Sequence, residues 1–269
     1  VTDTIEFYLN NQGSHLYPQV EAVEPQITAY LQKLFGPENV CITGSFKRQL
    51  EIIDELEYVV NNTNEAIKPK FLSANPPELL EEHADNLLYK LLNGLKLRLY
   101  TGGIAFQKQL FISSGSVEFT NAFITQFPSI NFSEQAKTDD STIFKQANIN
   151  YIPACLRESA KIIDRAQASP LPQLIQPEDI KGIIHSHSNW SDGSNTLEEM
   201  ANAAKEQGFE YLVISDHSKS AFYAQGLHEE KISAQHQLID ELNKKLTNFK
   251  IFKSIESDIL NDGSLDYSN

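Results

Sequence analysis

Two histidines separated by one residue follow an apolar run in the C-terminal half of the sequence. Gly182-Ile183-Ile184 leads into His185 and His187, and Asp192 follows in a Ser-Asp-Gly turn. Alternate side chains of a β-strand point to the same face, so the two imidazoles are expected to face one ion. A short loop can bring the Asp192 carboxylate to the same ion. Imidazole nitrogen and carboxylate oxygen together favour zinc, manganese or iron over calcium or magnesium.

Two further apolar runs end in side chains of the same kinds. The run at 211–215 is followed by Asp216-His217, and the run at 250–256 ends in Glu256. In a parallel α/β sheet, ligands gather at the carboxyl ends of the strands. Surface histidines without a metal are the alternative for any single position, but the shared placement at strand ends favours one metal site. The predicted metal ligands are His185, His187, Asp192, His217 and Glu256.

A regular alternation of strands and helices is expected to position these residues. Strands at 182–187, 211–215 and 250–256 alternate with helices at 196–207 and 229–246. Such alternation predicts parallel strands joined by right-handed crossovers.

The entry to this series carries two recognisable signals. Ser169-Pro170-Leu171-Pro172 opens a linker that is expected to run to Asp179. Asn195 is expected to cap the first helix, with Glu198 three residues later completing a capping box.

The upstream part of the sequence predicts a mixture of helices and strands. An Asn93-Gly94 turn predicts a hairpin with strands at 87–92 and 95–100. The other expected elements are helices at 3–11, 21–35 and 156–167, strands at 39–43 and 53–60, a possible edge strand at 68–72, a helix in the second half of 105–127, and an irregular segment at 129–150.

The composition is that of an ordinary globular protein with an acidic excess. Of 269 residues, 41% are hydrophobic and 22% are charged, and the formal net charge is −14. Nucleic-acid binders are usually basic, so strong non-specific affinity for DNA is not expected. No apolar run approaches the roughly 20 residues of a membrane span, and no signal-peptide pattern is present. Two cysteines fit a reducing compartment, and we expect a cytoplasmic protein.

The three metal-ligand motifs resemble those of the PHP (polymerase and histidinol phosphatase) domain. His185 and His187 with Asp192 match its first motif, Asp216-His217 its second, and Glu256 its third. The resemblance implies the start of a distorted (β/α)7 barrel that binds zinc or manganese. The further ligands of the family are not found before the chain stops, so a truncated barrel with exposed edges is expected.

Other segments resemble the bacterial family X DNA polymerases, which carry a C-terminal PHP domain. Trp190-Ser191-Asp192-Gly193 and Asp262-Gly263-Ser264-Leu265-Asp266-Tyr267 fit this family within the PHP-like part. Upstream, Gly44-Ser45-Phe46-Lys47-Arg48 matches its triphosphate-binding turn, and Tyr151-Ile152-Pro153 resembles the end of its thumb.

The resemblance implies a combined α/β and α+β fold. It assigns a nucleotidyltransferase-type palm to residues 1–125, a thumb to 126–168, a linker to 169–180 and a truncated PHP domain to 181–269. The sequence starts at Val1 inside an expected helix and stops as abruptly, so a fragment of a longer protein is expected.

The palm-like part departs from the family where catalysis needs its metal ligands. A palm polymerase holds two magnesium ions with three aspartates. Here Glu55 and Glu57 stand at the first two positions and Lys96 at the third. The extra methylene of glutamate moves its oxygens further than octahedral magnesium tolerates, and lysine repels the metal. A solvated strand face is the alternative for the two glutamates.

The triphosphate-binding turn keeps part of the family pattern. Gly44, Ser45 and Arg48 are the candidate nucleotide-binding residues, through backbone amides and the guanidinium fork. A purely structural turn is the alternative.

The resemblance thus implies a degenerate palm joined to a PHP-type metal-dependent phosphoesterase, a 3′-5′ exonuclease or 3′-phosphatase of DNA repair. An active DNA-directed DNA polymerase and a non-catalytic DNA- or partner-binding scaffold are the alternatives. The expected partners are DNA and deoxynucleotides without a membrane, and the expected cofactors are zinc or manganese at the PHP site and magnesium at the palm, if any.

Overall fold

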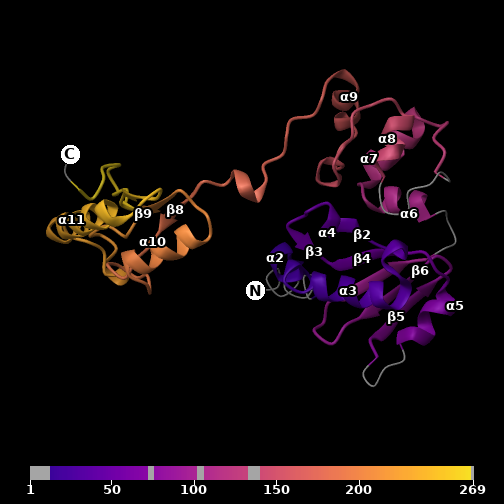
Figure 1. Ribbon diagram of the computed structural model, residues 1–269, viewed down its shortest axis with the longest axis horizontal. Coiled ribbons are helices and arrows are strands. Elements are labelled where there is room, and N and C mark those ends of the chain that lie inside the picture. The colour runs from indigo at the N-terminus through magenta and orange to yellow at the C-terminus, as the bar shows by residue number, and fades with distance from the viewer. Residues whose placement is uncertain (1–12, 72–75, 102–105, 133–139, 268–269) are drawn as a thin grey trace. The chain divides into compact units, whose positions relative to one another are not determined.

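The computed structural model describes residues 13–71, 76–101, 106–132 and 140–267 (Figure 1). The chain divides into two compact units, Val1–Pro172 and Gln173–Asn269, which are described separately below. The helix expected at 3–11 lies outside the described residues. Among the helices that are described, none is long and apolar enough to cross a bilayer.

A five-stranded mixed sheet forms the first part of the N-terminal unit. Its strand order is β2-β4-β7-β6-β5, in which β4 and β7 run parallel and all other neighbours run antiparallel. Alternation along the strands sends one set of side chains into an apolar core beneath the sheet. The strands are β2 (Val40–Thr43), β4 (Glu55–Val60), β5 (Glu78–His83), β6 (Asn86–Lys90) and β7 (Lys96–Tyr100), with a separate pair β1 (His15–Leu16) and β3 (Ile52–Ile53).

The helix expected at 21–35 is confirmed over most of its length as α3 (Glu24–Phe35), and a separate short helix, α2 (Tyr17–Glu21), precedes it. Pro25 lies in the first turn of α3, where backbone N–H groups have no partner within the helix, so the missing N–H of proline costs no hydrogen bond. Gly36 ends the helix with a φ of 90°. The remaining short helices of this part are η1 (Pro37–Asn39), α4 (Gly44–Lys47) and α5 (Asn64–Ile67).

The hairpin expected around Asn93-Gly94 is confirmed. Strands β6 and β7 pair antiparallel, and Gly94 supplies a φ of 88° in the connection. The edge strand proposed for 68–72 is wrong, because Lys68–Phe71 forms a 3-10 turn (η2). The edge is instead β5, whose six residues are all exposed and include three glutamates. Such charges are typical of sheet edges but hide the alternation that predicts a strand.

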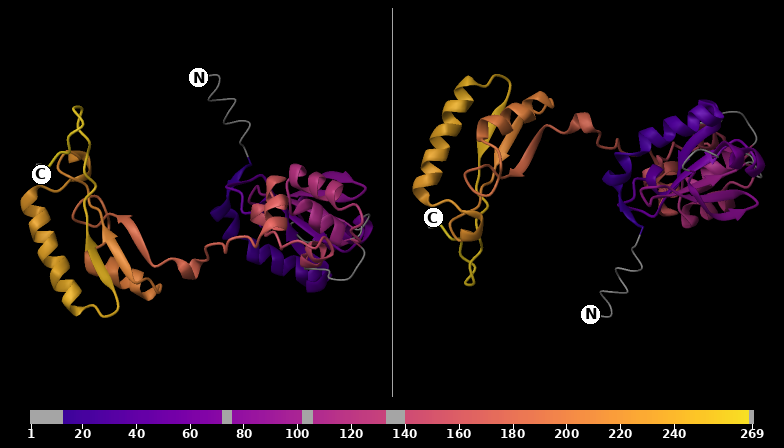
Figure 2. Two further views of the ribbon diagram at one scale, coloured as in Figure 1. Left: turned by 90° about the horizontal axis from the view of Figure 1, so that it is seen from above. Right: turned by 90° about the horizontal axis from the view of Figure 1, so that it is seen from below.

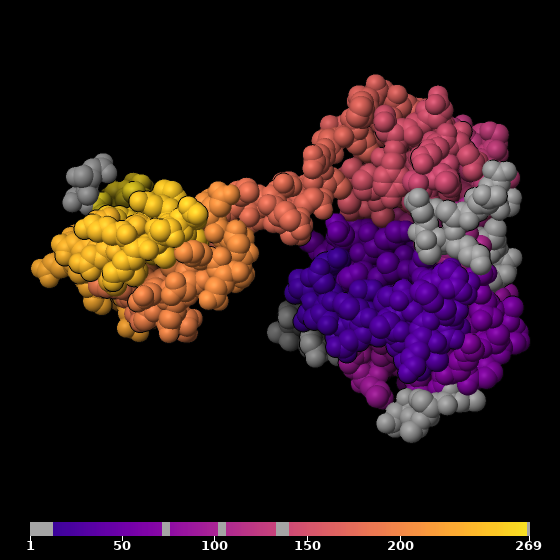
Figure 3. All heavy atoms as spheres, viewed as in Figure 1, coloured from indigo at the N-terminus to yellow at the C-terminus, as the bar shows by residue number. Residues whose placement is uncertain are grey.

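A helical part completes the N-terminal unit, and Figure 3 shows the surfaces of its two parts in contact. Helix α6 reaches β2 and β4, and Thr43 bonds to Ser113 and Ser114 at 2.6 and 3.0 Å. The core is a cluster of phenylalanines with the fully buried Arg157, which pairs with Asp140 at 2.5 Å. The helices are α6 (Phe106–Ser113), α7 (Val117–Gln126), α8 (Ser141–Gln146), η3 (Ala154–Leu156) and α9 (Lys161–Ala168).

The helix expected in the second half of 105–127 is confirmed as α7, and the described residues of the first half are also largely helical, as α6. Two other expectations for this part need correction. Helix α8 lies within the segment expected to be irregular. The helix expected at 156–167 starts only at Lys161, because the backbone first makes the η3 turn.

A three-stranded parallel sheet organises the C-terminal unit. Its order is β10-β9-β8, and helices α10 and α11 share one apolar core with these strands. Figure 2 shows α11 running alongside β10 in both views. The expected alternation of strands and helices is therefore confirmed. The elements are η4 (Pro177–Asp179), β8 (Gly182–Ser186), α10 (Leu197–Glu206), β9 (Tyr211–Ile214), η5 (Phe222–Ala224), α11 (Glu229–Lys245) and β10 (Lys250–Lys253).

The capping box of α10 lies one residue later than expected. Thr196, not Asn195, is the N-cap, and its hydroxyl accepts from the backbone N–H of Glu199 at 3.2 Å. The Glu199 carboxylate accepts in return from the backbone N–H of Thr196 at 2.8 Å. Both candidate pairs have the residue types of a capping box, and the chain selects between them only through the turn that precedes the helix.

The strands of the C-terminal unit form an open sheet within the described residues. One face is covered by α10 and α11, while Ile184 and Phe252 are exposed. Closure into a (β/α)7 barrel, and the palm and thumb assignments of the N-terminal unit, stay predictions.

Candidate metal centre

The first two candidate ligands lie at an irregular strand end. Strand β8 stops at Ser186, its pairing with β9 shifts register after Ile183, and His185 has a φ of 65°. The expectation that regular strand alternation places His185 and His187 on one face is therefore wrong. The rings nevertheless stack, with their centroids 5.4 Å apart and their planes at 12°. Left-handed backbone at a non-glycine residue is strained and is frequent at functional sites.

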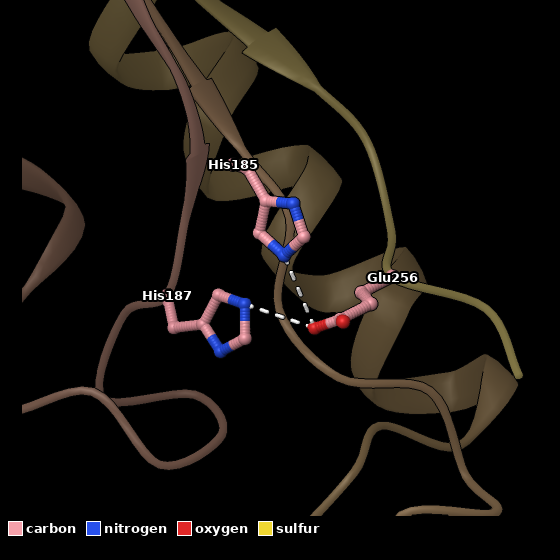
Figure 4. Close-up of side chains that lie close together, drawn as sticks. All are labelled: His185, His187 and Glu256. Atoms are coloured by element: carbon pink, nitrogen blue, oxygen red, sulfur yellow. Dashed lines mark ion pairs between the residues drawn. The ribbon is translucent and has the colours of Figure 1, made fainter. Parts of the chain in front are cut away.

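One oxygen of Glu256 is the centre of the cluster (Figure 4). Its Oε2 lies 3.3 Å from Nε2 of His185 and 3.1 Å from Nε2 of His187. Nδ1 of His217 lies 3.1 Å from the same oxygen. Three imidazoles, delivered from two strand ends, thus surround one carboxylate oxygen delivered from a third.

The backbone aligns His217 with Glu256. The two residues form an isolated parallel bridge beyond the ends of β9 and β10. The N–H of Glu256 donates to the Asp216 carbonyl at 3.1 Å, and the N–H of Ser218 donates to the Glu256 carbonyl at 3.0 Å. The sheet ladder therefore extends through the site and fixes the spacing of these two side chains.

Asp192 closes the cluster from the loop after His187. Its Oδ1 lies 3.0 Å from Nδ1 of His187, and its Oδ2 lies 3.5 Å from Nε2 of His217. The hydrogen bond with His187 holds the pKa of Asp192 below its ordinary value, and the charge of His217 acts in the same direction. Asp192 is therefore an anion at neutral pH and is available to a cation.

The donor set fits a divalent cation. His185, His187 and Glu256 form one group, and His187, Asp192 and His217 form another, with the ligand atoms of each group within 4.8 Å of one another. Oε2 of Glu256 is buried and has no hydrogen-bond partner, although three imidazole nitrogens lie close to it. A buried carboxylate oxygen without a partner is costly, and a cation between it and the imidazoles would satisfy it.

Asp216 has a different role from its neighbour His217. Its carboxylate is fully buried and accepts from Ser188 and Ser191 in the loop between His187 and Asp192 and from Gln235 of α11. It thereby ties the loop that carries Asp192 to β9 and α11. Sequence reasoning noted Asp216 only as part of a motif and missed Ser188, Ser191 and Gln235. The closely spaced serines around the histidines were the available signal.

A second buried carboxylate, Asp266, supports the segment after Glu256. It accepts from the Ser257 hydroxyl at 2.7 Å and from the Ser220 N–H at 3.0 Å. Although burial opposes it, hydrogen bonds from Ser218, Ser257 and Ser220 hold the pKa of Asp266 well below its ordinary value. Sequence reasoning named this residue only within a family motif.

The palm-like candidates in the N-terminal unit are satisfied by protein groups. Glu55 accepts from Nε and Nη2 of Arg98 on the parallel neighbour strand, at 2.5 and 3.0 Å. Glu57 accepts from the Ser45 N–H and the Tyr100 hydroxyl, each at 2.9 Å. Burial raises the pKa of Glu57 despite these two bonds. The exposed-strand alternative for the glutamates is wrong, since both are partly buried and bonded.

The candidate nucleotide-binding turn is occupied in the same way. Gly44 has a φ of 68°, and a Cβ there would lie 1.6 Å from the Glu57 carboxylate. Arg48 reaches towards Glu158, with 3.3 Å between Nη1 and Oε1. Gly44, Ser45 and Arg48 thus lie close to acidic side chains of the protein itself.

The comparisons with known proteins agree with this geometry. Residues 184–259 match the PHP domain family, and this segment contains all five clustered side chains. The chain is also 42% identical over 118 residues to the DNA polymerase/3′-5′ exonuclease PolX of Bacillus subtilis (strain 168). The alignment covers 44% of this chain and 20% of that protein, so the chain spans about a fifth of the curated relative it matches. Residues 184–259 of the C-terminal unit are therefore similar to the PHP domain.

Proposed function

We propose that the chain is part of a family X DNA polymerase-like repair protein whose PHP domain is a metal-dependent phosphoesterase. Its substrates would be DNA ends, through 3′-5′ exonuclease or 3′-phosphatase chemistry. The observation that carries the proposal is the position of Glu256 Oε2, which lies within 3.3 Å of three imidazole nitrogens and has no hydrogen-bond partner. The name of the relative, DNA polymerase/3′-5′ exonuclease PolX, supports hydrolysis from the 3′ end of a DNA strand.

The five clustered residues would be the metal ligands. A divalent cation would be held by His185, His187 and Glu256, or at a neighbouring position by His187, Asp192 and His217, with His187 serving one position at a time. Zinc, manganese or iron bound there would supply Lewis acidity towards phosphate oxygens and acidify a coordinated water at neutral pH. Asp192 stays ionised at that pH, and Asp216 holds the loop that carries it.

We further propose that the palm-like part no longer transfers nucleotides. Arg98 neutralises Glu55, and Glu57 accepts from the backbone N–H that a triphosphate would need at Ser45. Lys96 lies opposite Glu55 in the register of β4 and β7, at the third metal-ligand position expected from the resemblance. Binding magnesium there would require breaking these hydrogen bonds and overcoming the repulsion from the positive charges of Lys96 and Arg98.

The experiment tests metal content and hydrolysis together. The whole chain is loaded with manganese or zinc, bound metal is counted by elemental analysis, and removal of nucleotides or phosphate from 3′-labelled oligonucleotides is followed. Glu256→Gln and His187→Ala are expected to lower metal affinity about 100-fold or more and to abolish hydrolysis. His236→Ala, a partly buried histidine of α11 outside both clusters, is the matched control.

The outcomes separate the proposal from its alternatives. Primer extension with magnesium or manganese that is lost in Glu57→Gln would support an active polymerase. Absence of bound transition metal and of hydrolysis in the wild-type chain would leave a DNA- or partner-binding scaffold. The proposal also predicts that the protein acts in the cytoplasm on DNA and not at a membrane.

A further inference from the structure

Two aromatic side chains stand exposed beside the metal cluster. Phe222 is 85% exposed and Tyr223 75% exposed, which makes them the most exposed aromatic residues in the described part of the chain. The Tyr223 ring centroid lies 6.1 Å from that of His217, and the His217 ring lies 4.3 Å from that of His187. Only the width of the Tyr223 ring would therefore separate a planar group stacked on it from His217 of the cluster.

The loop that presents these rings is well fixed. The Leu227 N–H donates to the His217 carbonyl at 2.8 Å, and the Gly226 N–H donates to the Ala221 carbonyl at 3.0 Å. Ala221, Ala224 and Leu227 are buried in the same loop, while Phe222 and Tyr223 point outwards. The small residues thus anchor the loop and the large ones are left in water, the reverse of what stability alone favours.

The anchoring extends to the C-terminal segment. The Tyr267 hydroxyl donates to the Leu227 carbonyl at 2.5 Å and accepts from the Lys219 N–H at 3.2 Å. The Lys219 ammonium is paired with Glu229 at 2.6 Å. The cation of this loop is therefore already neutralised, and what the loop presents near the metal cluster is aromatic surface.

An exposed aromatic surface suits the binding of nucleotides by an acidic chain. With 36 acidic and 22 basic residues, it gains little from general attraction to a phosphate backbone. Base–aromatic stacking is worth about 1–3 kcal/mol per base, tolerates any base and depends weakly on charge. We propose that Tyr223, flanked by Phe222, stacks the base of the terminal nucleotide whose phosphate meets the metal cluster. This positioning role rests on the proposed phosphoesterase function.

A binding experiment tests the stacking without requiring turnover. The metal-loaded chain is titrated with the 5′-monophosphate of 2-aminopurine deoxyriboside, whose fluorescence is quenched by stacking. The wild type is expected to quench the probe, and Tyr223→Ala is expected to lose the quenching and bind about tenfold more weakly. Tyr223→Phe should retain both properties. Phe252→Ala, which removes an exposed aromatic from β10, is the control. Equal quenching by Tyr223→Ala and the wild type would overturn the proposal.

A kinetic experiment separates this inference from the proposed function. Removal of the 3′-terminal nucleotide is compared between an ordinary oligonucleotide and one that ends in an abasic residue. The wild type is expected to show a KM about tenfold lower for the ordinary end, and Tyr223→Ala is expected to lose this preference. Wild-type hydrolysis with no preference would refute the stacking alone. If the wild type hydrolyses neither end, the proposed function fails, and the probe titration still decides the stacking.

Discussion

The carboxylate of Asp216 accepts two hydrogen bonds from Ser188, one from the backbone N–H at 2.7 Å and one from the hydroxyl at 2.6 Å. It accepts two more from the Ser191 hydroxyl and the Gln235 amide. All four donors point at a group with no exposed surface. This one side chain therefore fixes the loop between His187 and Asp192.

Asp216→Asn is expected to destabilise the C-terminal unit by about 2–4 kcal/mol, because an amide group would face donors that now point at an oxygen. Metal affinity should fall about 10–100-fold, since the loop that carries Asp192 loses its anchor. Trp190 is the only tryptophan of the chain and lies in this loop, so its fluorescence in urea reports this unit selectively. Ser233→Ala on α11 is the control, with an expected change below about 0.5 kcal/mol. Unchanged stability in Asp216→Asn would contradict the anchoring role.

Asp266 predicts an acid-dependent contribution to stability. Its folded pKa lies well below the ordinary 3.8, so its stabilising effect is complete above that value and is lost as the pH falls below it. Asp266→Asn should therefore cost about 1–3 kcal/mol near pH 7. The difference between the variant and the wild type should shrink below about pH 4. Urea unfolding followed by Trp190 fluorescence between pH 7 and pH 3 measures this. A difference that stays constant over that range would show that Asp266 acts through packing.

Glu57 is expected to change stability with pH in the direction opposite to Asp266. Burial raises its folded pKa above the ordinary 4.5, so the wild type loses stability as the pH rises through the interval above 4.5, where the native state must ionise a buried carboxylate. Glu57→Gln removes this loss, because the amide oxygen still accepts from Ser45 and the amide N–H can donate to Tyr100. The variant should thus gain stability relative to the wild type as the pH rises above about 4.5. Calorimetry measures the stability of the N-terminal unit, through the unfolding transition that is not accompanied by a change in Trp190 fluorescence. A variant that is less stable than the wild type at pH 8 would contradict the interpretation.

The two candidate capping boxes of α10 allow a matched comparison. Thr196→Ala removes the hydroxyl that accepts from the Glu199 N–H and should cost about 1 kcal/mol. Asn195→Ala, one residue earlier, should cost clearly less, because that residue is not the N-cap. Fluorescence-monitored unfolding of both variants gives the comparison. Equal losses would mean that both residues cap the helix in solution.

The sequence by itself determined the alternation of the C-terminal unit. Each strand is an apolar run between polar turns, and each helix carries an apolar stripe, so local periodicity suffices for both. The presence of the Asn93-Gly94 hairpin was predictable because turn residues between two apolar runs reverse the chain. Its loop is one residue longer than a two-residue Asn-Gly turn, since the Leu91 N–H donates to the Leu95 carbonyl and Gly94 alone of the pair has a positive φ. Elements whose residues disguise their pattern were not predictable. The six exposed residues of β5 show no buried face. Helix α9 starts only after the η3 turn, whose C-cap Arg157 pairs with the distant Asp140 and accepts from the Ser116 N–H.

The sequence also identified which side chains gather at the candidate metal centre, because side chains at the carboxyl ends of parallel strands meet at one edge. Only the tertiary structure decided how they meet. His185 joins the cluster through a left-handed backbone and a register shift, not through strand alternation. Asp216 turns inward to hold the loop, whereas the adjacent His217 turns to the cluster. In the N-terminal unit, the strand partners of Glu55 and Glu57 lie 43 positions away, and Ser45 of the preceding turn lies 12 positions from Glu57. Local sequence carries no information about such pairings, because they depend on strand register and burial, which the whole fold sets.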